Sequence, residues 1–157
     1  PYSVAPDRLC ELGRFGQKTG AGWYRYEAGK RTPLPDPAVD ALLAEHCKRI
    51  GVPARKVSDE EIVDRCLIAL ANEGARILEE GIALRSLDID MVYLTGYGFP
   101  RYRGGPMFWI DNFGLPKAID RIGEFSKGYR GSCWAVAPLL QQLASSQGTF
   151  TQWKGKT

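Results

Sequence analysis

One long amphipathic segment constrains the fold of this chain more than any other feature. It opens at residues 58–61 (SDEE), where a serine at the N-cap and a glutamate three residues later mark a helix start. Apolar residues then recur with helical spacing to about Ala83, on a stripe broad enough to meet several neighbours. We therefore expect a central helix over 58–83. Gly74 lies on that apolar face, where it lets another helix come close.

The rest of the chain predicts shorter helices and no sheet, because no apolar–polar alternation exceeds about four residues. Asp36 and Pro37 suit the first positions of a helix, which Gly51 ends. The further expected helices are a short one near 7–12, one from Ser86 or Asp88 to Gly96, and those over 107–113, 116–125 and 138–147. The predicted fold is all-α, with about five or six helices around the 58–83 helix.

Residues 1–35 are rich in Gly, Pro and aromatic residues, and they predict an irregular lead-in with a short strand or extended stretch at 23–26. We place the domain boundary there, with the helical domain over 36–157. The 157 residues carry 21 Lys and Arg against 18 Asp and Glu, interspersed, so no nucleic-acid partner is indicated. No apolar run approaches the ~20 residues of a membrane span, and no signal segment opens the chain.

Few residues suit catalysis or metal binding. His46 is the single histidine and lies on the apolar stripe of the 36–50 helix, which predicts a packed or edge-of-core side chain. The cysteines are widely spaced, so we expect buried small hydrophobes and neither zinc ligands nor nucleophiles; they are Cys10, Cys47, Cys66 and Cys133. No Ser-His-Asp or Cys-His set can be assembled, and we predict no catalytic, cofactor-binding or metal-binding residue.

Two glycine-rich stretches remain, GRFGQKTGAG (13–22) and GYGFPRYRGGP (96–106). Neither has the spacing of a phosphate loop or a dinucleotide fingerprint, so structural turns are favoured. The alternative is contact with an anionic ligand such as a CoA phosphate, through Arg14, Lys18, Arg101 and Arg103. Asp111 is interpreted as a cap or hydrogen-bond anchor. The pairs at 64–65 and 72–73 are interpreted as a solvated or ion-paired helix face, with Arg65 reaching acids along the helix.

Three stretches, in order and correctly spaced, resemble one family. GRFGQKTGAGWYRYE resembles the segment that follows a helical domain in the 3-hydroxyacyl-CoA dehydrogenases. EIVDRCLIALANEGARILEEGIALRSLDID resembles their central-helix segment, and GYGFPRYRGGPMFWIDNFG resembles their GxGxPxGPFxxxDxxG segment. The last is most similar to the second helical repeat of the multifunctional β-oxidation enzymes, in which a hydratase half precedes the dehydrogenase half. Residues 1–35 would then be the end of the preceding helical repeat and a linker.

The resemblance implies that the chemistry lies outside this chain. In that family NAD and a catalytic His–Glu pair belong to a Rossmann domain, and an Asn of the first helical repeat assists. Asp64 stands at the position of that Asn, with Arg65 and Glu73 matching the following Arg and the later Glu. We therefore expect a C-terminal fragment of an NAD-dependent 3-hydroxyacyl-CoA dehydrogenase that is inactive alone and binds no NAD itself.

Two functions follow as hypotheses. The first is packing against the first helical repeat and the Rossmann domain, which shapes the acyl-CoA cleft. The alternative is a non-catalytic interaction module that self-associates through an exposed apolar face. The C-terminal residues 154–157 (KGKT) are not a peroxisomal tripeptide, so a bacterial-type cytoplasmic enzyme is predicted over a peroxisomal one.

Overall fold

The computed structural model describes residues 3–53, 55–128 and 130–155. Within these ranges the chain forms seven α-helices, three 3₁₀ helices and isolated β-bridges but no strand, which confirms the predicted all-α class. No helix there is long and apolar enough to cross a bilayer. The α-helices are α1 (Ala5–Glu11), α2 (Pro37–Arg49), α3 (Asp59–Glu79), α4 (Ser86–Gly96), α5 (Pro106–Phe113), α6 (Leu115–Ser126) and α7 (Pro138–Ser145), and the 3₁₀ helices are η1 (Gln17–Thr19), η2 (Arg101–Arg103) and η3 (Gly131–Cys133).

The chain divides into two compact units between Lys56 and Val57. The first unit contains α1, η1 and α2, and among its described residues (3–53 and 55–56) three apolar side chains are buried: Ala5, Leu9 and Val39. The predicted short strand or extended stretch at 23–26 is instead a turn, with bends at 22–24 and single bridges from Arg25 to Ala21 and to Leu34. Because α2 groups with the lead-in here, the boundary at residues 35 and 36 stays a prediction.

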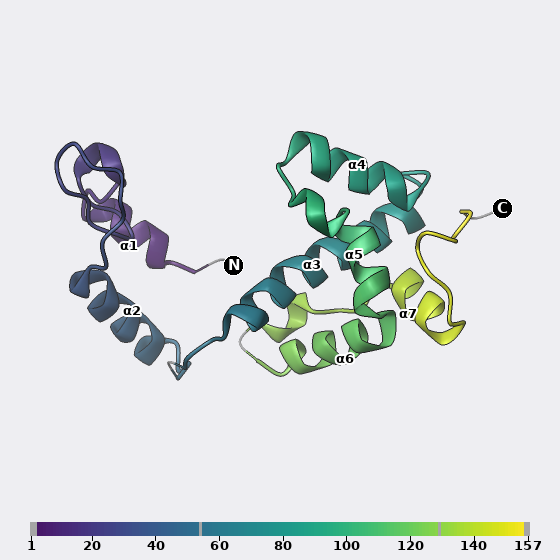
Figure 1. Ribbon diagram of the computed structural model, residues 1–157. Coiled ribbons are helices and arrows are strands. Elements are labelled where there is room, and N and C mark those ends of the chain that lie inside the picture. The colour runs from purple at the N-terminus through teal and green to yellow at the C-terminus, as the bar shows by residue number, and fades with distance from the viewer. Residues whose placement is uncertain (1–2, 54, 129, 156–157) are drawn as a thin grey trace. The chain divides into compact units, whose positions relative to one another are not determined.

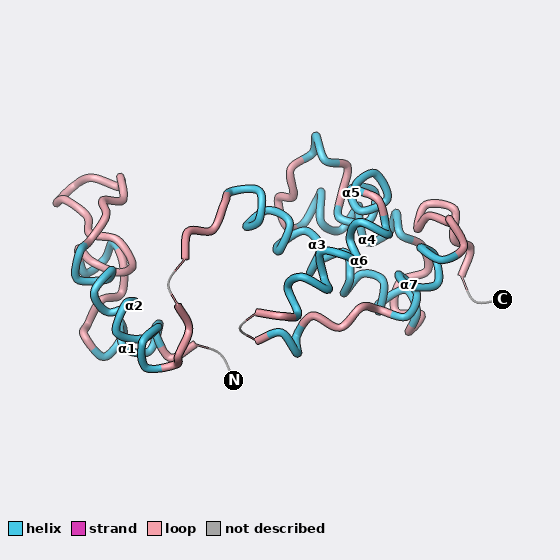
Figure 2. The backbone as a smooth tube through the Cα atoms, turned by 90° about the horizontal axis from the view of Figure 1, so that it is seen from below, coloured by secondary structure: helices cyan, strands magenta, loops and turns pink. Residues whose placement is uncertain are grey.

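In the second unit α3 is the central helix, and α4, α5, α6 and α7 all contact it (Figures 1 and 2). One face of α3 supplies fully buried small and branched residues, among them Ile68, Ala71 and Ala75. The other helices complete a single core with Met107, Ile110, Ile122, Phe125, Leu140 and, from the C-terminal segment, Phe150. The predicted helices at 107–113, 116–125 and 138–147 are thus present as α5, α6 and α7. Residues 156–157, on which the predicted compartment depends, lie outside the described ranges.

The central helix is shorter than predicted. It ends at Glu79, because Gly81 takes a left-handed conformation (φ 75°) and the amide of Ile82 turns back to the carbonyl of Ile77. Ile82, predicted as part of the apolar face, is 73% exposed. At the other end the side chains of Ile62 and Val63 are also exposed, so the buried face covers only the middle and the C-terminal half of α3.

The cysteine prediction is wrong. Cys10, Cys66 and Cys133 are exposed, Cys47 is half-buried, and all four are unpaired thiols. For Cys66 the reason lies in the shortened apolar face, since this residue sits beside Ile62 on the uncovered first turns of α3. Wide spacing in sequence excluded a zinc site but did not establish burial.

At Gly74 the side chain of Met107 on α5 lies directly against the backbone of α3. A Cβ atom built on Gly74 would lie 2.4 Å from the Sδ of Met107, whose side chain is fully buried. The prediction that this glycine admits a neighbouring helix is confirmed.

Gly74→Ala should therefore lower the free energy of unfolding by about 1–3 kcal/mol, because the added methyl overpacks a filled core. Gly123, inside α6, is the matched control, since a Cβ there meets nothing within 4 Å. Gly123→Ala should raise stability by about 0.5–1 kcal/mol. Urea unfolding followed by circular dichroism measures both changes, and an equal effect of the two substitutions would contradict the close-packing argument.

Candidate functional site

The α3 motif places Asp64 inside the second unit. Its side chain is buried, and its Oδ2 atom accepts hydrogen bonds from the Nε (3.1 Å) and Nη2 (2.9 Å) of Arg121 on α6. The neighbouring Arg65 donates to Glu61 one turn earlier at 2.9 Å, as predicted, and its guanidinium lies 4.1 Å from the centre of the Phe125 ring. The ion-paired interpretation holds for these residues, although Asp64 is not on a solvated face. Arg121 on α6 and Arg65 on α3 therefore each form a contact between the two helices.

Asn72 was assigned to the polar side of α3, and that assignment is wrong. Its side chain is buried: the Nδ2 atom donates to the carbonyl of Ala135 at 2.9 Å, and the Oδ1 atom accepts the amide of Ala137 at 2.8 Å. Arg76 donates to the same Ala135 carbonyl at 2.6 Å. An amide side chain satisfies both a donor and an acceptor of this irregular segment, so Asn72 fixes the approach to α7.

Asp90, which sequence reasoning missed, holds the start of α5. The amides of Met107 and Phe108 donate to its two carboxylate oxygens at 2.7 and 3.1 Å. Burial raises the pKa of this carboxyl, and the two amides oppose that rise. Gly105 (φ 107°) has no room for a side chain, because a Cβ there would lie 2.3 Å from Asp90 Oδ1. The Gly-Gly-Pro run before the helix was the signal that an acidic side chain packs against this turn.

Asp111, the predicted hydrogen-bond anchor, holds the C-terminal segment. It accepts the amides of Phe150 (2.8 Å) and Thr151 (2.9 Å) and the hydroxyl of Thr151 (2.8 Å). These bonds keep the buried Phe150 ring in the core. The prediction for Asp111 is confirmed.

In the first unit Arg14 has a structural role. Its guanidinium pairs with Asp36 and also donates to the carbonyl of Gly22 at 3.0 Å. Asp36 caps α2 by accepting the Ala38 amide at 3.0 Å, and the hydrogen bond from Arg14 is the main reason that the pKa of Asp36 lies below its usual value. The glycine-rich turn is therefore tied to the start of α2.

The other predicted anion contacts are more available. Lys18 lies over the Phe15 ring, 5.2 Å from its centre, on a groove of the first unit. Arg103 donates to the hydroxyl of Tyr102 at 3.2 Å, and Arg101 is exposed on the same turn. Arg14 and Lys18 belong to the first unit, and Arg101 and Arg103 belong to the second. Contact of these residues with a CoA phosphate stays a prediction.

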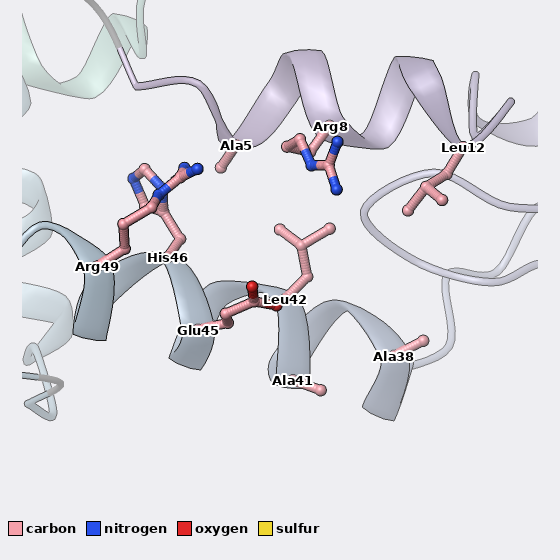
Figure 3. Close-up of a pocket in the computed structure, with 9 residues that line it drawn as sticks. All are labelled: Ala5, Arg8, Leu12, Ala38, Ala41, Leu42, Glu45, His46 and Arg49. Carbon is pink, nitrogen blue, oxygen red and sulfur yellow. The ribbon is translucent and has the colours of Figure 1, made fainter.

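His46 lines a groove of about 400 Å³ between α1 and α2 (Figure 3). It is half-buried, as predicted: Nδ1 accepts from Arg49 at 3.0 Å, so Nε2 carries the proton and donates to Ser3 Oγ at 3.2 Å. Figure 3 shows α1 and α2 side chains facing each other across this groove, and no cysteine lines it. Because Nε2 donates to the Ser3 hydroxyl, the ring is not placed as a base toward that hydroxyl.

The described residues do not fit NAD or a metal ion. A dinucleotide site needs a glycine-rich turn between a strand and a helix, and the described ranges contain no strand. In the same ranges no cluster of three His, Cys, Asp or Glu side chains is suited to hold a metal.

Comparison with protein families matches residues 62–156 to "3-hydroxyacyl-CoA dehydrogenase, C-terminal domain". The match includes the Asp64, Asn72, Asp90 and Asp111 contacts described above. The predicted resemblance is thereby confirmed for this part of the chain.

Similar proteins carry related names. The peroxisomal bifunctional enzyme of Danio rerio is 52% identical over 122 residues, and that of Homo sapiens is 48% identical over 125 residues. These matches cover 77% and 79% of this chain but only 17% of either relative, so the chain spans about a sixth of their length. The crystal structure of the dehydrogenase part of multifunctional enzyme 1 from C. elegans matches 90% of this chain and 32% of that one, with a TM-score of 0.63 and 26% identity.

If Arg14 stabilises the fold through its ion pair with Asp36, replacing it should weaken the α2 N-terminus less at acid pH than at neutral pH. Arg14→Gln is expected to loosen the α2 N-terminus at neutral pH, seen as faster hydrogen exchange of the Ala38 amide. Because the pKa of Asp36 is lowered in the folded state, the pair contributes stability above the ordinary value of 3.8, and this contribution is lost as pH falls through the lowered pKa. Below the lowered pKa, the Ala38 amide should be equally protected from hydrogen exchange in the variant and in the wild type. A difference in protection that does not change with pH would contradict the ion pair.

The Asp64–Arg121 pair predicts a double-mutant signature. Arg121→Met should cost about 3 kcal/mol of unfolding free energy, because it leaves a buried carboxylate without its partner. Asp64→Leu combined with Arg121→Met should restore most of that loss, since both charges are then replaced by apolar groups. Denaturant unfolding of the single and double variants measures the coupling, and strictly additive losses would rule out a buried pair.

Proposed function

The chain belongs to the family of 3-hydroxyacyl-CoA dehydrogenase C-terminal domains, and from this premise we propose that it is the second helical repeat of a multifunctional fatty-acid β-oxidation enzyme. Its role is to pack against the first helical repeat and to help shape the acyl-CoA cleft. The oxidation itself, an NAD-dependent reaction of a 3-hydroxyacyl-CoA, then uses groups elsewhere in the whole protein, including a Rossmann domain that holds NAD.

The observation that carries this proposal is that the polar residues of the family motifs bond within this chain. Asp64 is neutralised by Arg121, Asn72 is engaged at both its polar atoms, and Asp111 is bound to the C-terminal segment. A general acid or base must reach a substrate proton within hydrogen-bond distance, or through one water. Side chains that are bonded in this way within the fold support a packing role over a catalytic one.

A candidate surface for the first helical repeat lies on α4. Met91, Val92 and Tyr97 are 47%, 53% and 75% exposed, which is unusual for large apolar and aromatic side chains on an apolar helix. Helices that are apolar on all sides are normally buried. We call Met91 and Val92 the α4 outer face, and assign it to contact with the first helical repeat, together with Tyr97 at the C-cap of the helix.

The same face supports the second candidate function, a module that self-associates. An apolar patch is self-complementary, as a two-fold interface requires. Light scattering of the isolated chain separates the two functions: a concentration-dependent dimer that Val92→Asp abolishes favours self-association, and a strict monomer favours packing within one larger protein.

The compartment and the CoA contacts belong to the same proposal. The names of the vertebrate relatives favour a peroxisome over the cytoplasmic location that the sequence argument predicts. Among the candidate CoA-phosphate contacts, Lys18, Arg101 and Arg103 remain accessible, whereas the guanidinium of Arg14 is held by Asp36.

Segment replacement in a relative tests the proposed function. We expect the isolated chain to form no NADH from 3-hydroxybutyryl-CoA and NAD. A Danio rerio enzyme in which this chain replaces the matching 122-residue segment should keep its own rate of NADH formation within about threefold, because packing contacts survive at 52% identity.

The matched control is Val92→Asp in that chimera, which places a charge on the α4 outer face and leaves the core intact. It should lower NADH formation and thermal stability together. Turnover by the isolated chain would overturn the non-catalytic role, and an inactive but folded chimera would overturn the packing role.

A further inference from the structure

The surface formed by η2, the first turns of α3 and α5 has a hollow with a side chain standing beside it. The hollow has a volume of about 350 Å³, and its apolar walls are Val63 on α3 and Trp109 and Phe113 on α5. The rings of Trp109 and Phe113 stack with their centres 4.8 Å apart. Arg103 lines the same hollow and bonds to Tyr102, so Tyr102 lies at its rim.

Tyr102 projects from this surface. It is 83% exposed, the highest value among the large apolar and aromatic side chains of the described residues. The Nε atom of Arg103 donates to its hydroxyl at 3.2 Å, and the guanidinium lies 5.3 Å from the ring centre. Because the hydroxyl oxygen accepts that bond, its own hydrogen is free to donate. The ring therefore stands out from the turn with a hydrogen-bond donor at its tip.

The turn that carries Tyr102 is already ordered in the free chain. The amide of Gly104 donates to the carbonyl of Arg101 at 3.1 Å, and Gly104 takes a left-handed conformation (φ 75°). Phe99, which precedes the turn, is buried. A binding segment that is ordered beforehand loses little conformational entropy when it meets a partner, so this turn is suited to an interface.

The hollow offers an acceptor for such a donor. Asp64 lines it, and Arg121 bonds to its Oδ2 atom, whereas its Oδ1 atom accepts no hydrogen bond from the described residues. Among those residues no buried side-chain nitrogen or oxygen lacks a partner, so Oδ1 keeps access to the surface, and the hollow is where Asp64 reaches it. A carboxylate oxygen behind aromatic walls suits a phenolic hydroxyl, because a hydrogen bond to a charged acceptor is strong.

The charges of this surface are complementary to one another. Apart from the paired Asp64, the charged residues of the lining are Asp59, Glu60 and Arg103, which leaves one negative charge in excess. Arg101, at the start of η2, is exposed and supplies one positive charge beside the hollow. Neither Arg101 nor the two exposed acids form an ion pair with a described residue. The surface is therefore neutral as a whole and carries an unpaired charge of each sign.

We call the 101–103 turn and the hollow together the η2 surface, and we propose that it is an interface between two copies of this chain related by a two-fold axis. Such an interface uses the same patch on both copies, so each projection needs a hollow, and each charge its opposite, within that patch. The η2 surface contains both kinds of pair. A partner of any other kind would have to supply a ring, a hollow and charges of both signs in the matching order.

In this dimer Tyr102 of each copy enters the hollow of the other and donates its hydroxyl to Asp64, while Arg101 pairs with Glu60. Aromatic and arginine side chains are enriched at the residues that dominate interface energies. The interface uses no residue of the α4 outer face and does not depend on the proposed packing role.

Sedimentation velocity of the full chain over a wide range of concentrations tests the interface. We expect a reversible dimer whose dissociation constant rises with salt, because ion pairs at its rim are screened. Tyr102→Ala should weaken the dimer about tenfold, since an aromatic side chain is lost from the hollow. Tyr97→Ala is the matched control: it removes a tyrosine that is 75% exposed but lies outside the η2 surface, and it should leave the dimer unchanged.

Charge reversal tests the two-fold arrangement itself. Arg101→Glu and Glu60→Arg should each weaken self-association about tenfold, because each places like charges opposite one another at both equivalent contacts. An equimolar mixture of the two variants should dimerise again, since both contacts of the mixed dimer then join opposite charges. Compensation inside one chain cannot produce this rescue. Lys127→Glu, which reverses a charge at an exposed position beyond α6, is the control and should change nothing.

Three outcomes would overturn the proposal: a chain that stays monomeric at every concentration, a mixture of the charge variants that does not dimerise, or a dimer that Val92→Asp disrupts and Tyr102→Ala does not. The first two leave the packing role intact, because the chimera measures that role independently, and the third assigns self-association to the α4 outer face. Circular dichroism establishes that each variant is folded. Arg101 and Glu60 are exposed, so the charge reversals decide the question even if Tyr102→Ala unfolds.

Discussion

The second unit depends on the close contact between α3 and α5 at Gly74. Only a residue without a side chain lets the Met107 sulfur reach the α3 backbone, and the contact sets the distance between the two helices. Ala71 and Ala75 flank it, so this face of α3 is flat and α5 lies close against it along its buried side. The positions of α4 and α6 then follow, because both contact α5 through short connections. A central helix with a larger residue at position 74 would need a different arrangement of its neighbours.

Polar side chains connect the segments that this packing brings together. Three of these side chains take up backbone groups that no helix satisfies: Asp90 at the start of α5, Asn72 before α7, and Asp111 at the C-terminal segment. A buried backbone amide without an acceptor costs about as much as a lost hydrogen bond. The irregular segments can therefore lie against the core only where such a side chain meets them.

The sequence predicted what depends on local signals. Proline at a first helical position, glycine after a last one and a capping serine located α2, the start of α3, and α5 to α7 within one or two residues. Asp111 was identified as a cap or hydrogen-bond anchor because it directly follows the apolar run at 107–110. The failures concern contacts between distant segments. The burial of Asn72, with partners 63 and 65 residues away, leaves no local pattern. The Gly-Gly-Pro run before α5 signals a close contact, but nothing local identifies Asp90 as the residue that makes it. The exposure of the cysteines depends on which turns of α3 its neighbours cover, and periodicity does not determine that.

One position illustrates how a repeat can keep a fold while its chemistry differs. The resemblance places an assisting Asn of the first repeat where this chain has Asp64. An amide at the surface of a cleft can bond to a substrate, whereas a carboxylate at the same place on α3 attracts the nearest cation. Here that cation is Arg121 on α6, and the pair is shielded from water on the Asp64 side. With its Oδ2 atom bonded to Arg121, the position serves the α3–α6 contact. On the proposed assignment to the second repeat, replacing an amide with a carboxylate, with one arginine in reach, exchanges a substrate contact for an internal ion pair.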